Sequence, residues 1–207
     1  TGGSGTDRIT AVLPGLVAGV TESTDWINTT RKGKDLFVCR DVNCTIYGGS
    51  GDEEITAAAA GSGDIAVLAG WTNSPDFPVS SRTGAPQPVY AGGKRDGFLI
   101  VESGSSPGWS SYFGGTGDDA ILAVTVVPGA ASTDTATVLI AGETTSPNLP
   151  AEGGIQPAPG GGRDGFLARL ALDGTSVLEC SYWGGAGDDA ITAVDATPIS
   201  YWIGGRS

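Results

Sequence analysis

The segment Gly-Gly-x-Gly-x-Asp/Glu-x-Ile occurs four times in this chain, and it constrains the fold more than any other feature. A motif that returns after tens of residues indicates a repeat protein, in which each unit is one small sheet or helix pair packed on its neighbours. The four copies are Gly2–Ile9, Gly48–Ile55, Gly114–Ile121 and Gly184–Ile191.

Short apolar segments bounded by turn residues follow each copy. The 35 glycines and 12 prolines separate these segments rather than running together, a pattern typical of many short strands. No longer stretch has a helical apolar face, so we expect little or no helix. The predicted strands are 9–13, 16–21, 35–40 and 44–47 in the first unit, 55–60, 65–71, 96–102 and 109–113 in the second, 121–127, 137–141, a strand from 164, and 177–183 in the third, and 191–195 and 201–203 in the last.

Units of four short strands are typical of β-propeller blades. We therefore predict an all-β fold in which residues 1–207 form one array of blades with four antiparallel strands each. The count is about 3.5 blades, fewer than the ring of at least four that a propeller needs. The ring stays incomplete unless another chain or missing sequence completes it. The expected units are about 2–47, 48–113 and 114–183, with a half blade at 184–207.

Three further motifs recur in the same order in successive units. They are Gly-x-Thr-x-Ser at the end of the second strand, Asp-x-Phe at the start of the third, and an aromatic residue before the next Gly-Gly. The copies are Gly19–Trp26, Gly70–Phe77 and Gly142–Leu149 for the first motif, Asp35 with Phe37, Asp96 with Phe98 and Asp164 with Phe166 for the second, and Tyr47, Phe113 and Trp183 for the third.

Together these motifs resemble the SBBP-type β-propeller repeat family, which is found mainly in secreted and cell-surface bacterial proteins. The resemblance covers essentially the whole chain and implies a propeller fold and an extracellular or cell-surface setting. It implies no single activity. The first unit departs from the pattern, because Trp26 is followed by Ile27 where the other units have Pro78 and Pro150.

Composition excludes several functions. The formal net charge of −12 repels nucleic acid and anionic membrane surfaces, and no apolar run is long enough for membrane insertion. The chain has no His, which removes the usual general base and zinc ligand. We therefore expect no enzyme and no catalytic residue. The chain also has no Met, so we expect a processed or excised segment.

The acidic residues of the glycine motif have two interpretations. In the first, Asp7, Asp119 and Asp189 cap turns by accepting main-chain N–H bonds, and the glycines supply positive φ. In the second, a calcium ion binds at Asp118/Asp119 or Asp188/Asp189, because calcium prefers oxygen ligands. The copies are too far apart for a calcium-binding β-roll. No other cofactor is expected.

Residues that recur in every unit are expected to be structural, because a catalytic residue would occur once. Tyr47, Phe113 and Trp183 are expected to pack in the blades. Trp26, Trp71 and Trp109 are less regular, and we expect exposed or interface packing of them rather than a sugar-stacking surface. The repeat-structural set is Gly48, Gly49, Asp96, Phe98, Gly114, Gly115, Asp164, Phe166, Gly184 and Gly185.

The three cysteines have different expected states. Cys39 and Cys44 flank a short turn, so they lie across a hairpin at a distance that a disulfide can bridge. Such a bond favours an oxidising, extracytoplasmic setting. Two unpaired thiols are the alternative. Cys180 is expected to be unpaired or to bond to another chain.

Two functions follow from these observations. The first is a non-enzymatic extracellular structural protein that self-associates, as a filament or surface-layer subunit, or that belongs to a larger propeller. A neighbouring chain would complete its half blade by adding strands. The second is an adhesin-like module that binds a glycan or a protein through the long loops Thr72–Arg95 and Thr144–Arg163.

Overall fold

The computed structural model describes residues 7–22, 33–40, 43–79, 85–104, 106–130, 135–150 and 153–207. These residues form strands, turns and loops and contain no helix, so the prediction of an all-β chain is confirmed. No helix that could cross a membrane is found in this described part.

The strands form three four-stranded antiparallel sheets and one two-stranded hairpin. Within each sheet the strands follow one another in chain order, each paired antiparallel with the next. The first sheet contains β1 (Asp7–Leu13), β2 (Leu16–Thr21), β3 (Asp35–Arg40) and β4 (Asn43–Tyr47), the second β5 (Glu53–Ala60), β6 (Ile65–Thr72), β7 (Asp96–Ser103) and β8 (Ser106–Phe113), the third β9 (Asp119–Val127), β10 (Thr137–Thr144), β11 (Asp164–Ala171) and β12 (Val177–Trp183), and the C-terminal hairpin β13 (Ala190–Thr197) and β14 (Ser200–Arg206).

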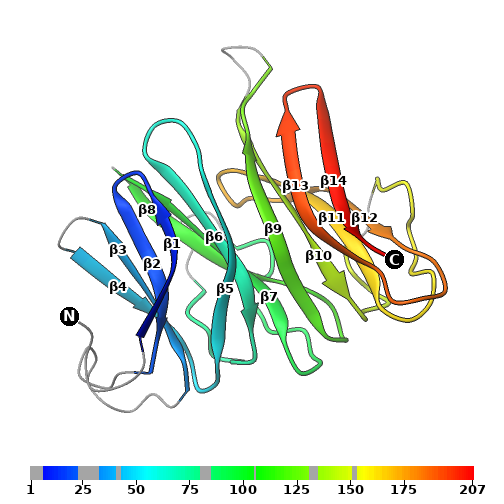
Figure 1. The fold of residues 1–207 in the computed structure, drawn as a ribbon, viewed down its shortest axis with the longest axis horizontal. Helices are drawn as coiled ribbons and strands as arrows, with labels where there is room; N and C mark the ends of the chain where they lie inside the picture. The colour runs from blue at the N-terminus through cyan, green and yellow to red at the C-terminus, as the bar shows by residue number, and fades with distance from the viewer. Residues whose placement is uncertain are drawn as a thin grey trace.

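The sheets stand side by side in chain order, from the first sheet at one end to the C-terminal hairpin at the other (Figure 1). Their first strands are neighbours: β1 contacts β5, β5 contacts β9, and β9 contacts β13. The sheets do not close a ring within the described residues.

The second sheet is buried on both faces because its central strands are apolar at consecutive positions. Side chains alternate between the two faces of a strand. Leu68 and Phe98 therefore join the core against the first sheet. Val67 and Leu99, their neighbours in the chain, join the core against the third sheet. The third sheet packs its other face on the C-terminal hairpin through a smaller core.

A β-bulge recurs at the same place in every unit. The motif isoleucine lies opposite a glycine of the next strand, and the register shifts directly after it. The strands approach so closely here that a Cβ on Gly142 would lie 1.9 Å from the carbonyl oxygen of Ala120. Only glycine fits such an approach. The paired residues are Ile9 with Gly19, Ile55 with Gly70, Ile121 with Gly142 and Ile191 with Gly205.

The motif isoleucines allow a matched test of the packing between sheets. Ile121 is 0% exposed between the second and third sheets, whereas Ile9 is 62% exposed at the end of the array. We expect Ile121→Ala to lower the free energy of unfolding by about 2–5 kcal/mol, and Ile9→Ala to change it by less than about 0.5 kcal/mol. Urea unfolding of both variants measures this, and equal losses would contradict the packing described.

Candidate functional site

The acidic residue at the sixth position of the glycine motif is a buried acceptor that joins two motifs. Asp119 accepts hydrogen bonds from the main-chain N–H of Gly115 (2.8 Å), from Ser146 Oγ (2.7 Å) and from Thr144 Oγ1. The glycine motif is thereby bonded to the Gly-x-Thr-x-Ser motif of the same unit. Glu53 makes the same bonds with Gly49, Thr72 and Ser74 in the preceding unit.

The remaining amides of the glycine turn bond to the same segment. Thr116 N–H donates to Asn148 Oδ1 (2.9 Å) and Gly117 N–H donates to Ser146 Oγ (2.8 Å). Asp118 N–H donates to Thr145 Oγ1 (2.8 Å). Each of these amides therefore has a side-chain acceptor in the Gly-x-Thr-x-Ser segment, which fixes the conformation of the turn.

The acidic residue at the fifth position joins consecutive sheets. Asp118 Oδ1 accepts the main-chain N–H of Lys94 (2.6 Å), and Asp188 Oδ1 accepts that of Arg163 (3.0 Å). The donors come just before the third strand of the preceding sheet.

The turn-capping interpretation of the sixth-position residues holds for Asp119, which accepts the N–H of Gly115, and for Asp189, which accepts the N–H of Gly185 at 2.8 Å. The side chain of Asp7 lies outside the described residues.

The described residues contain no group of three or more acidic, His or Cys side chains that could hold a metal ion. Calcium takes six to eight oxygen ligands. Each candidate site has two carboxylates, which supply fewer oxygens than that. Calcium binding at Asp118/Asp119 or Asp188/Asp189 stays a prediction.

The prediction that the motif glycines supply positive φ is wrong for the copies that the structure describes. Their small size matters instead. A Cβ on Gly184 would lie 2.4 Å from Asp164 Oδ1 and 2.7 Å from Asp189 Oδ2, so the glycine allows carboxylates of two consecutive units to approach one turn. A Cβ would also collide with neighbouring side chains at Gly48, Gly49 and Gly114, and at Gly115, but at Gly185 the space is open.

The aspartate and phenylalanine of the Asp-x-Phe motifs have structural roles in the second and third units. Asp96 accepts the N–H of Ala91 at 2.7 Å, and Asp164 accepts that of Gly160 at 3.1 Å, so each aspartate caps the loop before its strand. Phe98 and Phe166 are fully buried between sheets.

Two of the buried carboxyls have strongly raised pKa values. Burial raises the pKa of Glu53 from 4.5 to about 7, against the opposing effect of its Ser74 and Thr72 hydrogen bonds. Burial, with the nearby Asp119 carboxylate, raises the pKa of Asp96 from 3.8 to about 7. Burial raises the pKa of Asp119 as well.

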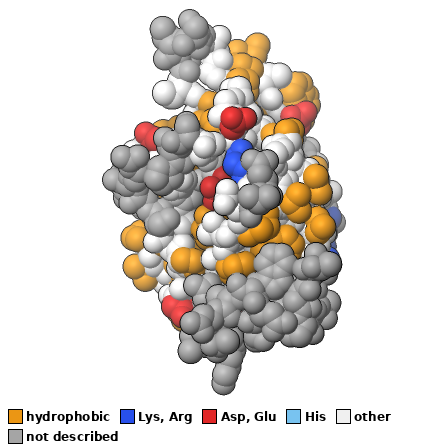
Figure 2. Space-filling model, turned by 90° about the vertical axis from the view of Figure 1, so that its left-hand side faces the viewer, with side chains coloured by type: hydrophobic (Ala, Val, Ile, Leu, Met, Phe, Trp, Pro, Cys, Tyr) orange, Lys and Arg blue, Asp and Glu red, His pale blue; other side chains and the backbone are white. Residues whose placement is uncertain are grey.

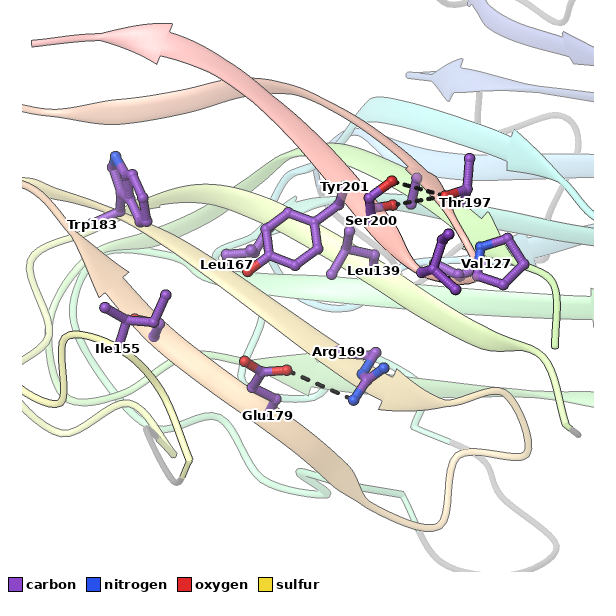
Figure 3. A pocket seen from close by; sticks show the side chains of 14 residues that line it. Val127, Leu139, Ile155, Leu167, Arg169, Glu179, Trp183, Thr197, Ser200 and Tyr201 are labelled. Atoms are coloured by element: carbon purple, nitrogen blue, oxygen red, sulfur yellow. Dashed lines mark hydrogen bonds and ion pairs between the residues drawn. The ribbon is translucent and has the colours of Figure 1, made fainter. Parts of the chain in front are cut away.

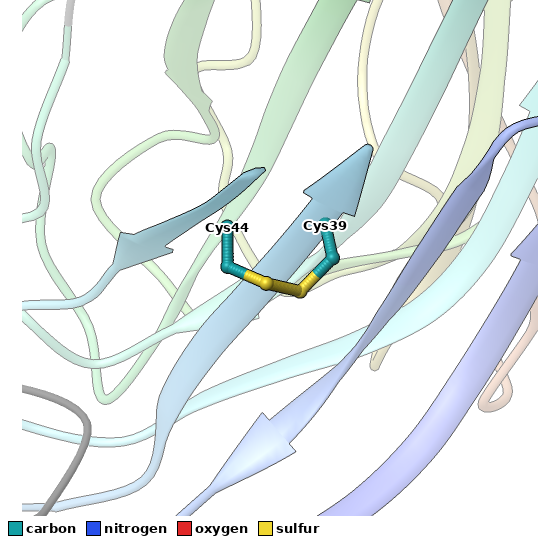
Figure 4. The surroundings of a disulfide bond; sticks show 2 residues. All are labelled: Cys39 and Cys44. Carbon is teal, nitrogen blue, oxygen red and sulfur yellow. A yellow bond between two sulfur atoms is a disulfide. The ribbon is translucent and has the colours of Figure 1, made fainter. Parts of the chain in front are cut away.

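The structure contains a disulfide between Cys39 and Cys44, which face each other across β3 and β4 (Figure 4). The bond closes the outer hairpin of the first sheet. Cys180 is a buried free thiol whose pKa is raised to about 12 by burial. Its surroundings are the apolar core between the second and third sheets.

An ion cluster that the sequence reasoning missed ties the C-terminal hairpin to the third sheet. The buried Glu143 carboxylate accepts bonds from Arg95 (2.7 Å), Arg206 (2.8 Å) and Arg163 (3.4 Å). The repeat alignment offered a signal, because Arg95, Arg163 and also Lys34 each directly precede an Asp-x-Phe motif.

The outer half of the third sheet is open where the hairpin ends. Trp183 is 45% exposed, although Phe113, at the same position of the second sheet, is 1% exposed. The prediction that Trp183 packs in a blade core is therefore wrong here, because only two strands lie beyond the third sheet. A groove of about 170 Å³ runs along this surface between Leu167, Trp183 and Tyr201 (Figure 3). Arg169 and Glu179 pair on its floor at 3.7 Å.

Trp109 is an interface residue, Trp71 contacts Arg95 of its own unit, and Trp26 lies outside the described residues. Trp109 is buried between the second and third sheets, and its indole N–H donates to the carbonyl of Leu172 (2.8 Å). Trp71 is partly buried beneath the Arg95 guanidinium, 5.5 Å from the ring centre. The Trp109 contact agrees with interface packing. Parts of both long loops, residues 80–84 and 151–152, lie outside the described residues, and the binding role of the loops stays a prediction.

The opposite end of the array also exposes apolar side chains. Ile9 and Val12 of β1 are mostly exposed. Figure 2 shows hydrophobic side chains at this end of the molecule, between the grey residues that the structure does not describe. Both ends therefore leave uncovered the positions that are buried between sheets.

No family model matches the chain. A segment of 71 residues is 39% identical to the regulatory protein FlaEY of Caulobacter vibrioides, covering 33% of this chain. The chain spans only 7% of the length of that protein. The matched length is close to that of one repeat unit, such as residues 114–183.

The shared serine tests the bonded junction. We expect Ser146→Ala to lower the free energy of unfolding by about 1–3 kcal/mol, because the buried Asp119 loses a donor and the Gly117 amide loses its acceptor. Thr175→Ala, which removes an exposed turn bond to Asp173, is the control and should cost less than about 0.5 kcal/mol. Urea unfolding measures both, and a neutral Ser146→Ala would contradict the role assigned to the junction.

The raised pKa values predict a pH dependence. The folded protein holds the Glu53 and Asp96 protons more tightly than the unfolded chain does, so their stabilising contribution is complete below about pH 4 and is lost as pH rises through about 7. We expect the urea midpoint to fall between pH 5 and pH 8, and the Glu53→Gln/Asp96→Asn variant to fall less. A midpoint that rises over this range in the unmodified protein would contradict the prediction.

Proposed function

We propose that this chain is a non-enzymatic structural protein whose sheets are blades of a β-propeller, as in the SBBP-type repeats that it resembles. The blades associate with a neighbouring copy at the open ends of the array. The proposal depends on one observation: the repeat positions buried between sheets are exposed at both ends. These are Ile9 against Ile121, and Trp183 against Phe113.

The open ends have the chemistry of an interface. Trp183, Trp202 and Ile199 are large apolar side chains that stay exposed at the C-terminal end, at 45%, 59% and 90%. Trp183 and Ile199 line one groove, whereas Trp202 faces the other side of the hairpin. Exposed apolar groups are typical of association surfaces. Strand β14 pairs with β13 alone among the described strands. Its other edge can take a further strand from a neighbouring chain.

The recurrent polar residues support a structural role. Asp96, Asp119 and Asp164 cap turns and loops within the array. Asp118 and Asp188 accept bonds from the preceding sheet, so the repeated chemistry is used in building the array. The Cys39–Cys44 disulfide favours an oxidising, extracellular or cell-surface setting.

Self-association is tested by sedimentation velocity over a range of concentrations. We expect the unmodified chain to associate, and Trp183→Asp/Trp202→Asp to raise the dissociation constant at least tenfold, because a charge in an apolar contact is costly. Val89→Asp, at an exposed position on a loop of the second unit, is the matched control and should associate as the unmodified chain does. A chain that stays monomeric at all concentrations would reject the proposal.

A further inference from the structure

A pocket of about 340 Å³ lies between the first and second sheets, where strands β2 and β6 end. Both sheets have all four of their strands, so the pocket is at an internal junction of the array. Its lining combines the Trp71 indole with the charged side chains of Arg8, Lys34 and Glu54. This volume is within the usual range for small-molecule sites, which is about 300–1,000 Å³.

The junction between the second and third sheets shows how the same place is closed one unit further on. Arg95 lies over the Trp71 ring there, 5.5 Å from its centre, and its guanidinium bonds to the Glu143 carboxylate at 2.7 Å. An ion pair on an aromatic side chain therefore occupies the space that the pocket leaves open at the first junction.

The repeat register explains why the first junction differs. Lys34 and Arg95 each directly precede the third strand of their sheet. Corresponding positions of the second strands lie opposite the residue after the third-strand aspartate, and the pairs are Val20 with Leu36, Trp71 with Gly97 and Glu143 with Gly165. At the first junction an indole thus replaces the carboxylate that pairs with the cation. Lys34 is 3.8 Å from Glu22 instead.

The Trp71 side chain offers two groups to a ligand. The ring is partly buried, and its negative π-face favours contact with weakly positive C–H groups. Within the described part of the chain its indole N–H makes no hydrogen bond, whereas that of Trp109 donates to the Leu172 carbonyl at 2.8 Å. Trp71 can therefore stack on a ring and also donate to it.

The charged groups of the pocket favour a neutral ligand. Arg8 pairs with Glu54 at 3.0 Å, Lys34 pairs with Glu22, and Asp52 accepts the main-chain N–H of Lys34 at 3.0 Å. Each cation already has a carboxylate partner, so an ion would meet both signs of charge. The paired groups still have spare N–H donors and acceptor oxygens. Hydroxyl groups can use both, because they donate and accept.

We propose that this pocket binds one neutral saccharide residue, whose C–H face stacks on Trp71 and whose hydroxyl groups bond to the Arg8–Glu54 and Lys34–Glu22 pairs. A sugar ring combines an apolar face with a rim of hydroxyls, which matches an indole beside paired charges. The assignment reverses the expectation that Trp71 does not stack on sugars. It goes beyond the proposed association, because the site is complete in one chain.

The test follows the indole N–H signals of the ¹⁵N-labelled full chain by NMR, and the Trp71 signal is identified by its loss in Trp71→Phe. The probes are the methyl glycosides of glucose, galactose, mannose and N-acetylglucosamine at millimolar concentrations. We expect at least one of them to move the Trp71 signal saturably. Sorbitol, a polyol without a ring, should not move it saturably.

Matched variants make the result specific to the pocket. Trp71→Ala should raise the dissociation constant of the bound glycoside at least tenfold, measured by saturation-transfer NMR. Trp202→Ala, at an exposed tryptophan of the C-terminal hairpin, should leave it unchanged. The inference is overturned if no glycoside moves the Trp71 signal, if sorbitol moves it equally, or if Trp71→Ala binds as tightly. The titration of the unmodified chain decides the question even where Trp71→Ala fails to fold.

Discussion

The structure depends on the buried carboxylate at the sixth motif position. Asp119 accepts bonds from Gly115, Thr144 and Ser146, so a single group joins the start of a unit to the end of its second strand. A buried carboxylate is costly unless donors surround it. The turn, the strand end and the acid therefore need one another, and the repeat keeps all three.

This coupling explains why the sequence predicted the strands and the four-stranded sheets well. Ile121, Gly142 and Phe166 belong to motifs that recur in fixed order, and they mark the first, second and third strands of a unit. All fourteen strands lie where the motifs and apolar segments predicted them, with ends that differ by a few residues. Burial on both faces was not predicted, although Leu68 and Val67 are adjacent and both apolar.

Features that depend on neighbouring sheets were harder to predict. The carboxylates of Asp164 and Asp189 approach Gly184 from two different units, and no local sequence pattern reveals this approach. A positive φ was therefore the simpler explanation for the glycine. The Glu143 cluster gathers arginines from three separate segments, which no local pattern reveals. Trp183 fits a core pattern, and its exposure depends only on what stands beyond it.

The exposure of Trp183 has an energetic consequence. In a repeat array the stability is close to a sum of the intrinsic stability of each unit and of the interfaces between neighbours. Interior positions such as Ile121 and Phe113 contribute to two neighbouring sheets, whereas Ile9 and Trp183 have a neighbour on one side. Covering Trp183 would add an interface of the kind already seen over Phe113, with its stacked Phe166 ring. The driving force for the association that we propose is thus the packing that holds the second sheet to the third, repeated once more.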